Sequence, residues 1–212
     1  MKNKSLLVVA AHEDDAELSA GGTMMRLHNL GWKVYVIVTS DSGGGTRSSV
    51  LAAQEGDAAL KVLKTEPPII FNYPDKEVPF NLDIIAKLNT YIDKIKPELI
   101  ITHSLLESHQ DHINTSKSVL AAARYQKNIW MFEPLFPSKL HNTGFRSIMY
   151  VDISDAMEAK IAAIKKHKSQ TKTHPFWIDY TLSLGTIRGI ENQCKYAECF
   201  EPIKCEYIPE KI

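Results

Sequence analysis

Residues that could bind a metal ion are concentrated in the stretch Ala11-His12-Glu13-Asp14-Asp15-Ala16-Glu17. It follows an apolar run, residues 6–10, that is typical of a buried parallel strand, and it precedes residues 18–27, whose apolar side chains recur at helical spacing. In open α/β sheets, ligands bind outside the carboxyl ends of the strands. A histidine followed three residues later by an aspartate can place two ligands on one metal ion, which makes His12 and Asp15 candidate ligands. The competing interpretation is a solvated acidic turn, because carboxylates also stabilise a helix N-terminus.

A second group of polar residues follows the strand predicted at 99–103 and consists of His109, Asp111 and His112. These residues lie where a helix predicted over 111–124 begins, at the same edge of the sheet as the first group. Three of the chain's 8 histidines fall within ten residues here. One such histidine alone would usually be a surface or hydrogen-bonded residue. Together with the first group, the cluster indicates a metal site.

Strand and helix patterns alternate along the chain, with proline and glycine between them. We expect strands at 33–39, 69–71, 99–103, 129–132 and 147–151, and helices at 47–64, 82–95, 154–168 and 177–190. This alternation predicts an α/β fold with a mostly parallel sheet and helices on both faces, a Rossmann-like three-layer sandwich. No repeat or linker divides the chain, so we expect a single domain over residues 1–212.

Charge and composition exclude several classes of partner. The chain has 25 basic and 25 acidic residues, so no net field attracts nucleic acid or an anionic membrane. No apolar run approaches the length of a membrane-inserted helix, and residues 6–11 are too short for a signal core, which predicts a cytoplasmic protein. Cys194, Cys199 and Cys205 lack zinc-ribbon spacing, so we expect reduced thiols.

A zinc ion held by His12, Asp15 and His112 would have three protein ligands and one open position, as catalytic sites do. Zinc lowers the pKa of its bound water to near ~7, which makes a nucleophile available at neutral pH. His and carboxylate ligands also accept Fe²⁺, so the metal used in the cell stays open between the two.

The remaining residues of the two groups have matching roles in hydrolysis. Asp14 is adjacent to Asp15 and can face the water as general base. His109 can stabilise the oxyanion that develops when an amide or ester carbonyl is attacked, and Asp111 can hold that imidazolium oriented. The set is complete for metal-assisted hydrolysis of an amide.

These motifs resemble those of the LmbE-like, or N-acetylglucosaminylphosphatidylinositol de-N-acetylase-like, zinc hydrolases. That family has an Ala-His-Pro-Asp-Asp motif after the first strand, here Ala11-His12-Glu13-Asp14-Asp15, and a second motif ending in Asp-His, here His109-Gln110-Asp111-His112. The similarity extends through most of the chain, to Arg47, Glu55, Pro74-Asp75, His167 with Ser169-Gln170, Arg188-Gly189 and Tyr196-Ala197-Glu198.

The resemblance implies a function and a set of roles. The family removes acetyl groups from N-acetylated amino sugars, so the expected partner is a small-molecule N-acetyl-amino-sugar compound, hydrolysed to acetate and a free amine. The zinc ligands would be His12, Asp15 and His112, the general base Asp14, and the electrostatic stabiliser or general acid His109. Arg47 and Asp75 would contact sugar hydroxyls.

Two departures from the family pattern stand out. Glu13 replaces the usual proline, which loosens the turn and adds a negative charge near the metal. Glu107 stands where the branch acting on thiol sugars has a tyrosine. His167 lies near the end of the helix predicted at 154–168, where the ordinary interpretation is a surface histidine stabilised by the helix dipole.

Two other functions are compatible with the sequence. One is a nucleotide- or sugar-binding Rossmann-like protein without catalysis, for which the glycine-rich loop Ser40–Thr46 is the supporting feature. The other is a metal-dependent hydrolase of another amide or of an ester. The sequence leaves the oligomeric state open, and a homo-oligomer is compatible with it.

Overall fold

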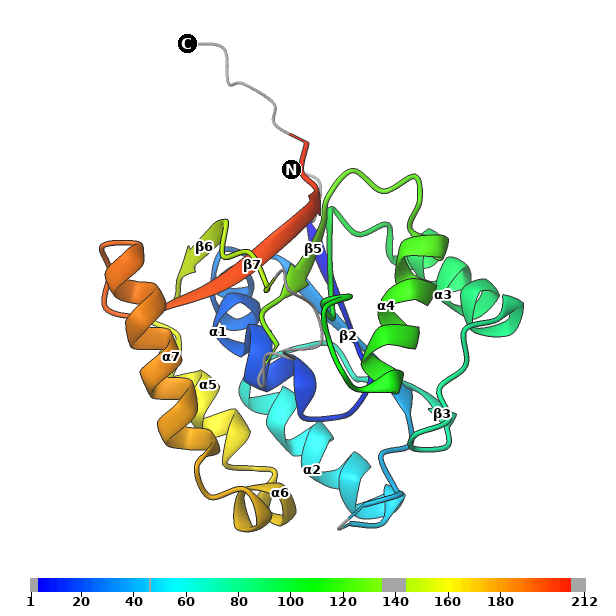
Figure 1. The fold of residues 1–212 in the computed structure, drawn as a ribbon, viewed down its shortest axis with the longest axis horizontal. Helices are drawn as coiled ribbons and strands as arrows, with labels where there is room; N and C mark the ends of the chain where they lie inside the picture. Colours follow the sequence, from blue (N-terminus) through cyan, green and yellow to red (C-terminus); the bar gives the residue numbers. More distant parts are fainter. Residues whose placement is uncertain (1–3, 46, 135–143, 207–212) are drawn as a thin grey trace.

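The structure is a computed structural model that describes residues 4–45, 47–134 and 144–206, so Thr46 of the glycine-rich loop lies outside the described residues. Its strands form one sheet in the order β3-β2-β1-β4-β5-β7-β6 (Figure 1). The first five strands of this order, β3, β2, β1, β4 and β5, run parallel to one another, whereas β7 runs antiparallel to both β5 and β6. The strands are β1 (Ser5–Ala10), β2 (Lys33–Ser40), β3 (Ile69–Tyr73), β4 (Leu99–Thr102), β5 (Ile129–Phe132), β6 (Met149–Asp152) and β7 (Ala197–Lys204).

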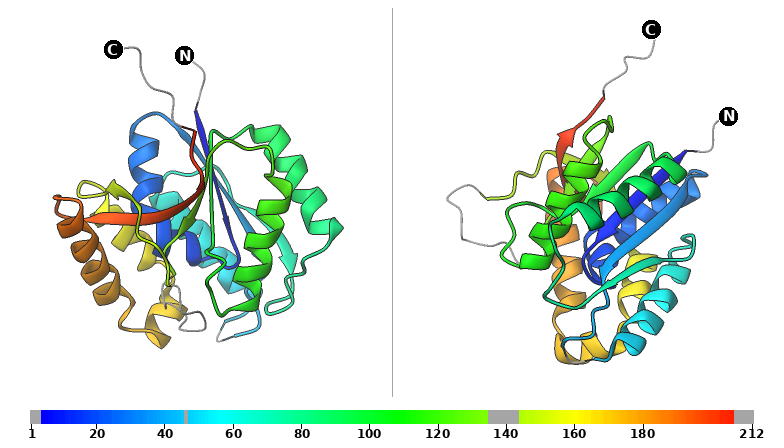
Figure 2. Two further views of the ribbon diagram at one scale, coloured as in Figure 1. Left: turned by 45° about the horizontal axis from the view of Figure 1, so that its top comes forward. Right: turned by 90° about the vertical axis from the view of Figure 1, so that its right-hand side faces the viewer.

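Helices cover both faces of the sheet, as the two views of Figure 2 show. They are α1 (Asp15–Asn29), α2 (Ser49–Val62), α3 (Leu82–Ile95), α4 (Gln110–Ala122), α5 (Met157–Ile164), α6 (Lys168–Thr173) and α7 (Trp177–Glu191). Side chains of β1 alternate between two cores: Leu6 and Val8 pack with α1, α2 and α5, and Leu7 and Val9 pack with α3 and α4. All four are fully buried, as expected for a parallel strand covered on both faces. The predicted three-layer α/β sandwich is therefore confirmed.

The strand order reverses direction at β1. The chain moves from β1 outward to β2 and β3 on one side, and then returns to place β4 and β5 on the other side. The loops after β1 and β4 therefore diverge and open a crevice at the carboxyl ends of these two neighbouring strands. Both groups of candidate residues follow these strands.

Two parts of the C-terminal third differ from the prediction. The helix expected at 154–168 begins only at Met157, because Ser154 donates hydrogen bonds to Asp152 in a preceding turn, and it ends at Ile164 before the separate helix α6. Residues 197–204, which have no clear pattern, form the long strand β7. Its pairing shifts register beside Pro202, and proline cannot donate a ladder hydrogen bond.

A buried ion pair joins β7 to two helices. The Glu198 carboxylate accepts hydrogen bonds from the Lys160 ammonium at 2.6 Å and from the backbone N–H groups of Gly22 and Thr23 at 2.8 and 2.7 Å. Glu198 and Lys160 are both buried. The pair fixes β7 and α5 against the middle of α1, the helix whose first turn carries the candidate site. Within the described residues, no helix is both long enough and apolar enough to cross a membrane.

We expect Glu198→Ala to lower the free energy of unfolding by about 3–5 kcal/mol, because it leaves the buried Lys160 charge without a partner. Urea unfolding followed by circular dichroism measures this change. The matched control is Asp57→Ala, which removes the partner of Lys61 in a pair whose lysine is 74% exposed, and we expect it to cost below about 1 kcal/mol. Equal effects of the two substitutions would contradict the role of Glu198.

Candidate metal centre and its two cavities

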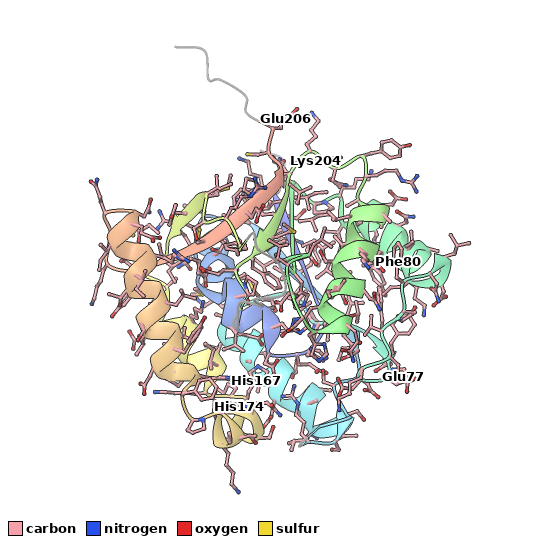
Figure 3. The ribbon with its side chains drawn as sticks, viewed as in Figure 1. Glu77, Phe80, His167, His174, Lys204 and Glu206 are labelled. Carbon is pink, nitrogen blue, oxygen red and sulfur yellow. The ribbon has the colours of Figure 1, made fainter. Side chains whose placement is uncertain are left out.

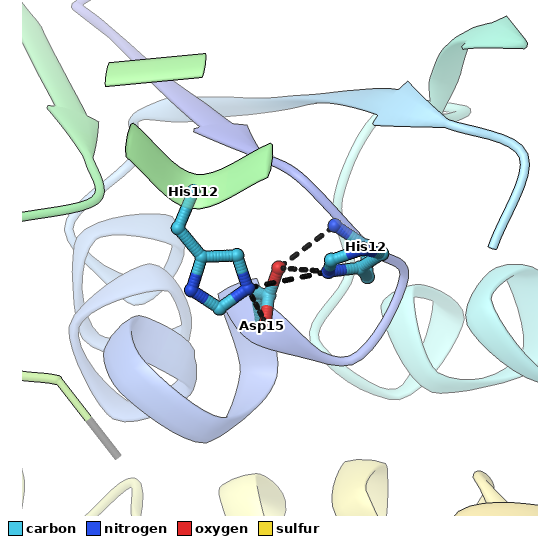
Figure 4. Close-up of side chains that lie close together, drawn as sticks. All are labelled: His12, Asp15 and His112. Carbon is cyan, nitrogen blue, oxygen red and sulfur yellow. Dashed lines mark hydrogen bonds and ion pairs between the residues drawn. The ribbon is translucent and has the colours of Figure 1, made fainter. Parts of the chain in front are cut away.

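Three candidate ligand side chains converge at the crevice between β1 and β4. His12 Nδ1 lies 3.2 Å from His112 Nε2 and 3.3 Å from Asp15 Oδ2, and His112 Nε2 lies 3.5 Å from Asp15 Oδ1 (Figure 4). His12 follows β1, Asp15 begins α1, and His112 lies in the first turn of α4. The structure thus brings the three predicted ligands together.

These separations fit a zinc ion. Ligand atoms placed tetrahedrally at 2.0–2.1 Å from zinc are about 3.3 Å from one another, which matches the observed spacing. Four carboxylates, those of Asp15, Asp75, Glu107 and Asp111, lie within 3.5 Å of the two imidazoles. The cluster carries an excess of negative charge that a divalent cation would offset.

The carboxylates around the two imidazoles shift the pKa values of the cluster. Burial alone would lower the pKa of His12, but its hydrogen bonds to neighbouring aspartates raise that pKa well above its usual value. Burial would likewise lower the pKa of His112, yet Asp15 and Glu107 raise it. For Asp15, burial would raise the pKa, but the adjacent histidines lower it far more. The site therefore stabilises positive charge where the metal would lie.

Two aspartates orient His12 from its other ring nitrogen. His12 Nε2 lies 3.1 Å from Asp75 and 3.3 Å from Asp111, which leaves Nδ1 as the ligand atom. Asp111 also accepts hydrogen bonds from the backbone N–H groups of Lys76 and Val78. We expected Asp111 to orient His109, but its carboxylate instead holds His12 and ties the loop after β3 to α4.

His112 is held by a carboxylate and a stacked ring. Its Nδ1 lies 3.4 Å from Glu107, and its ring stacks on His103 with centroids 4.0 Å apart. His103 accepts a hydrogen bond from the Ala11 N–H at Nε2. Burial first, and the neighbouring His112 second, lower the pKa of His103 to about 4. His103 is therefore a neutral support for the site.

His109 is positioned as a hydrogen-bond donor. Its Nδ1 accepts the backbone N–H of Asp111 at the start of α4, so a neutral ring carries its proton on Nε2. Burial, followed by the charge on His112, lowers the pKa of His109. Both effects favour the neutral ring over the imidazolium that we expected, and the ring lies edge-on to His12 with centroids 5.0 Å apart.

Asp14 is held by a buried arginine. Arg47, from the loop after β2, donates to Asp14 at 3.1 Å, and its guanidinium also lies 3.5 Å from Glu55 and 3.7 Å from Glu13. The side chain of Arg47 is 3% exposed. Arg47 thus fixes the carboxylate predicted to act as base. Contact of Arg47 and Asp75 with sugar hydroxyls stays a prediction.

His167 is fully buried, so the expectation of a surface histidine is wrong. It lies 3.2 Å from Glu17 and 3.5 Å from Arg47, between α5 and α6 (Figure 3). Burial alone would lower its pKa, but the charge of Glu17 raises it. This histidine extends the ionic network behind Asp14, and the likeness of its segment to the His-x-Ser-Gln motif was the signal for that placement.

Two cavities meet at the candidate metal centre. Both are lined by Asp14, His109, His112 and Trp177. The first, which we call the apolar lobe, has a volume of about 240 Å³ and is also lined by Asp15, Leu18, Ser19, His103, Glu107, Ser108 and Phe132. The second, the polar lobe, has a volume of about 260 Å³ and is also lined by His12, Ser42, Gly45, Arg47, Asp75, Gln170 and His174.

Several of these residues gave no signal in the sequence. Glu107 stood out only as a departure from a family motif, although it is the carboxylate partner of His112. Trp177 begins α7 and His174 follows the end of α6, so both lie far along the chain from the two motifs. Their rings stack with centroids 5.1 Å apart. Their place at the site follows from tertiary packing alone.

Comparison with known proteins identifies the family. The sequence model of the GlcNAc-PI de-N-acetylase (PIG-L) family matches residues 7–123, more than half of the chain. The chain belongs to this family. This membership confirms the resemblance to LmbE-like hydrolases and the predicted enzyme class, an amidohydrolase acting on linear amides.

Proteins similar to this chain include deacetylases and a hydratase. Diacetylchitobiose deacetylase of Thermococcus kodakarensis is 23% identical, covering 92% of this chain and 81% of the relative. The uncharacterized deacetylase YaiS of Escherichia coli is 29% identical, covering 79% and 92%. The crystal structure of GalB, the 4-carboxy-2-hydroxymuconate hydratase of Pseudomonas putida, superposes with a TM-score of 0.85 at 21% identity, covering 99% of both chains. At that identity, GalB shows the shared fold alone.

We expect Glu107→Ala to weaken zinc binding by about 10- to 100-fold, because His112 loses the carboxylate that orients it. Competition with a chromogenic chelator measures the affinity. The matched control is Glu77→Ala, since Glu77 is exposed and lies outside both lobes (Figure 3). An unchanged zinc affinity in a correctly folded Glu107→Ala protein would show that Glu107 does not support the ligand.

Proposed function

We propose that this protein is a zinc-dependent N-deacetylase that hydrolyses the acetamide of an N-acetyl-amino-sugar compound to acetate and a free amine. The observation that carries this proposal is the convergence of His12, Asp15 and His112 beside Asp14, at the junction of two cavities. Membership of the PIG-L family and the name of the Thermococcus relative, a diacetylchitobiose deacetylase, support the acetamide as the bond that is cleaved.

His12, Asp15 and His112 would hold the metal. A bound zinc ion would polarise the amide carbonyl and lower the pKa of a coordinated water. Asp14 accepts the proton of the attacking water as its oxygen bonds to the carbonyl carbon. The protonated Asp14 then delivers this proton to the amine nitrogen as the carbon–nitrogen bond breaks.

His109 stabilises the charge that develops on the carbonyl oxygen. Its Nε2–H donates a hydrogen bond to that oxygen, and donors placed for the oxyanion typically contribute about 10²–10³-fold to the rate. Arg47 keeps Asp14 oriented, and the ring of His12 is fixed by Asp75 and Asp111. These contacts exist before substrate binds, so little reorganisation accompanies the reaction.

The polar lobe accounts for recognition of the sugar. Hydroxyl groups need hydrogen-bond partners when they leave water, and Ser42, Arg47 and Asp75 line this lobe. Asp75 is kept in place by close packing, because a Cβ atom at Gly44 would lie 2.5 Å from its Oδ2. The glycine therefore permits Asp75 to reach both His12 and the lobe.

The test is the release of acetate and free amine from a panel of N-acetyl-amino sugars by the protein as purified, after chelation, and after zinc is restored. We expect activity that chelation abolishes and zinc restores. Because GalB is a hydratase of the same fold, the panel includes an unsaturated dicarboxylic acid. Hydration of that acid without acetate release from any sugar would replace the proposal with a lyase function.

We expect Asp14→Asn to lower kcat by about 10²–10⁴-fold while zinc stays bound, because the amide cannot accept the proton of the attacking water. Turnover of N-acetylglucosamine compounds and metal content by mass spectrometry measure the two effects separately. The control is Asp57→Asn on the exposed face of α2. A near-normal kcat for Asp14→Asn would remove Asp14 from the role of general base.

A further inference from the structure

The apolar lobe is larger than deacetylation requires. An acetyl group has one methyl carbon beyond its carbonyl, whereas the lobe has a volume of about 240 Å³. An apolar protein cavity of about 150 Å³ is known to hold a benzene molecule, which has six carbons. The lobe therefore has space for a group much longer than one methyl beside the metal centre.

We propose that the apolar lobe binds the acyl group of the substrate and accepts an aliphatic chain of about four to six carbons. This inference rests on the proposed function, and it specifies the substrate as an N-acyl amino sugar that is not restricted to N-acetyl. The polar lobe then holds the sugar on the other side of the metal centre.

The chemistry of the two lobes sets this orientation. Leu18, Phe132 and Trp177 form the apolar part of the wall of the apolar lobe, and a sugar hydroxyl placed against it would lose its hydrogen bonds to water without replacement. The polar side chains that line the lobe are two serines, Ser19 and Ser108, and those of the metal centre, where His103 and Glu107 contact His112. An aliphatic chain gains free energy on the apolar walls, and hydroxyls gain partners in the polar lobe.

The ligand atoms lie where the two lobes join. His12 lines the polar lobe, Asp15 lines the apolar lobe, and His112 lines both. An amide whose carbonyl lies at this junction has its nitrogen substituent on one side and its acyl carbon on the other. One placement of the amide therefore fills both lobes and presents the scissile bond to Asp14, which also lines both.

The wall of the apolar lobe is well packed rather than loose. Leu18 comes from the first turn of α1 and packs in one buried cluster with Ile164 and Trp177. Trp177 is 6% exposed, and its ring stacks on His174 in nearly parallel planes, 13° apart. Such a wall holds the lobe near its volume of about 240 Å³, which limits the length of acyl chain that the lobe can bury.

The experiment compares glucosamine carrying N-acetyl, N-propionyl, N-butyryl and N-hexanoyl groups, with release of free amine as the readout. We expect kcat/KM to rise about fourfold for each added methylene, equivalent to about 0.8 kcal/mol of burial, until the lobe is full. An N-butyryl substrate that is hydrolysed at least 100-fold less efficiently than the N-acetyl substrate would overturn the inference and leave the proposed deacetylase standing.

A binding measurement tests the proposed acyl site without catalytic turnover. Titration calorimetry of the zinc-loaded protein with acetate, butyrate and hexanoate tests the lobe even if none of the amides is hydrolysed, a result that would count against the proposed function alone. We expect the dissociation constant to fall about fourfold per methylene. Equal constants for the three carboxylates would overturn the acyl site.

Two substitutions in α1, each made separately, should narrow the apolar lobe. In both Leu18→Trp and Ser19→Leu, we expect the ratio of N-butyryl to N-acetyl kcat/KM, and the preference for butyrate over acetate in binding, to fall at least tenfold. Ser19 is only partly buried, so its substitution keeps the test valid if Leu18→Trp fails to fold. Leu30→Trp is the control, because Leu30 ends the same helix and is 67% exposed. Unchanged ratios in both variants would overturn the inference.

Discussion

The side chains of the metal centre depend on one constraint, namely that β1 and β4 are parallel neighbours whose following loops diverge. Val9 pairs with Thr102, so the residues after Ala10 and Thr102 emerge side by side at the edge of the sheet. The hydrogen bond from the Ala11 N–H to His103 joins the two strand ends directly. Neither loop alone supplies a complete ligand set. Because the pairing of β1 with β4 already fixes the two strand ends, little additional conformational entropy is lost when the ligands come together.

The burial of carboxylates creates a second constraint, because their negative charges must be compensated inside the protein. Asp111 is fully buried, Glu107 is nearly so, and an uncompensated buried charge costs several kcal/mol. Around the metal centre the compensation comes from the two imidazoles and the backbone N–H groups of the loop after β3. Behind Asp14 it comes from Arg47 and His167. The two networks meet at the short segment from His12 to Asp15, which explains why so many charges surround so few residues.

Local sequence patterns were enough to predict most of the helices and strands, the fold that they form, and the candidate ligands that follow strand ends. The apolar runs and helical spacings identified the three-layer fold, and the position of His12, Asp15 and His112 next to strand ends predicted that they would meet. Trp177 and Glu107 could not be assigned in this way, because their place at the site depends on how α7 and the loop after β4 pack. His167 was misjudged for the same reason: its helix ends at Ile164, and the chain then turns inward toward Glu17.

Glu13 shows how packing changes the meaning of a substitution. Read from the sequence, a glutamate in place of proline adds a negative charge beside the metal. In the structure its side chain is buried against α2, where a Cβ atom at Gly56 would lie 2.8 Å from the Cβ atom of Glu13. Burial raises the pKa of Glu13 against the opposing effects of Ser42 and Arg47. The raised pKa favours the neutral form of Glu13, and the absence of a side chain at Gly56 leaves room for this glutamate against α2.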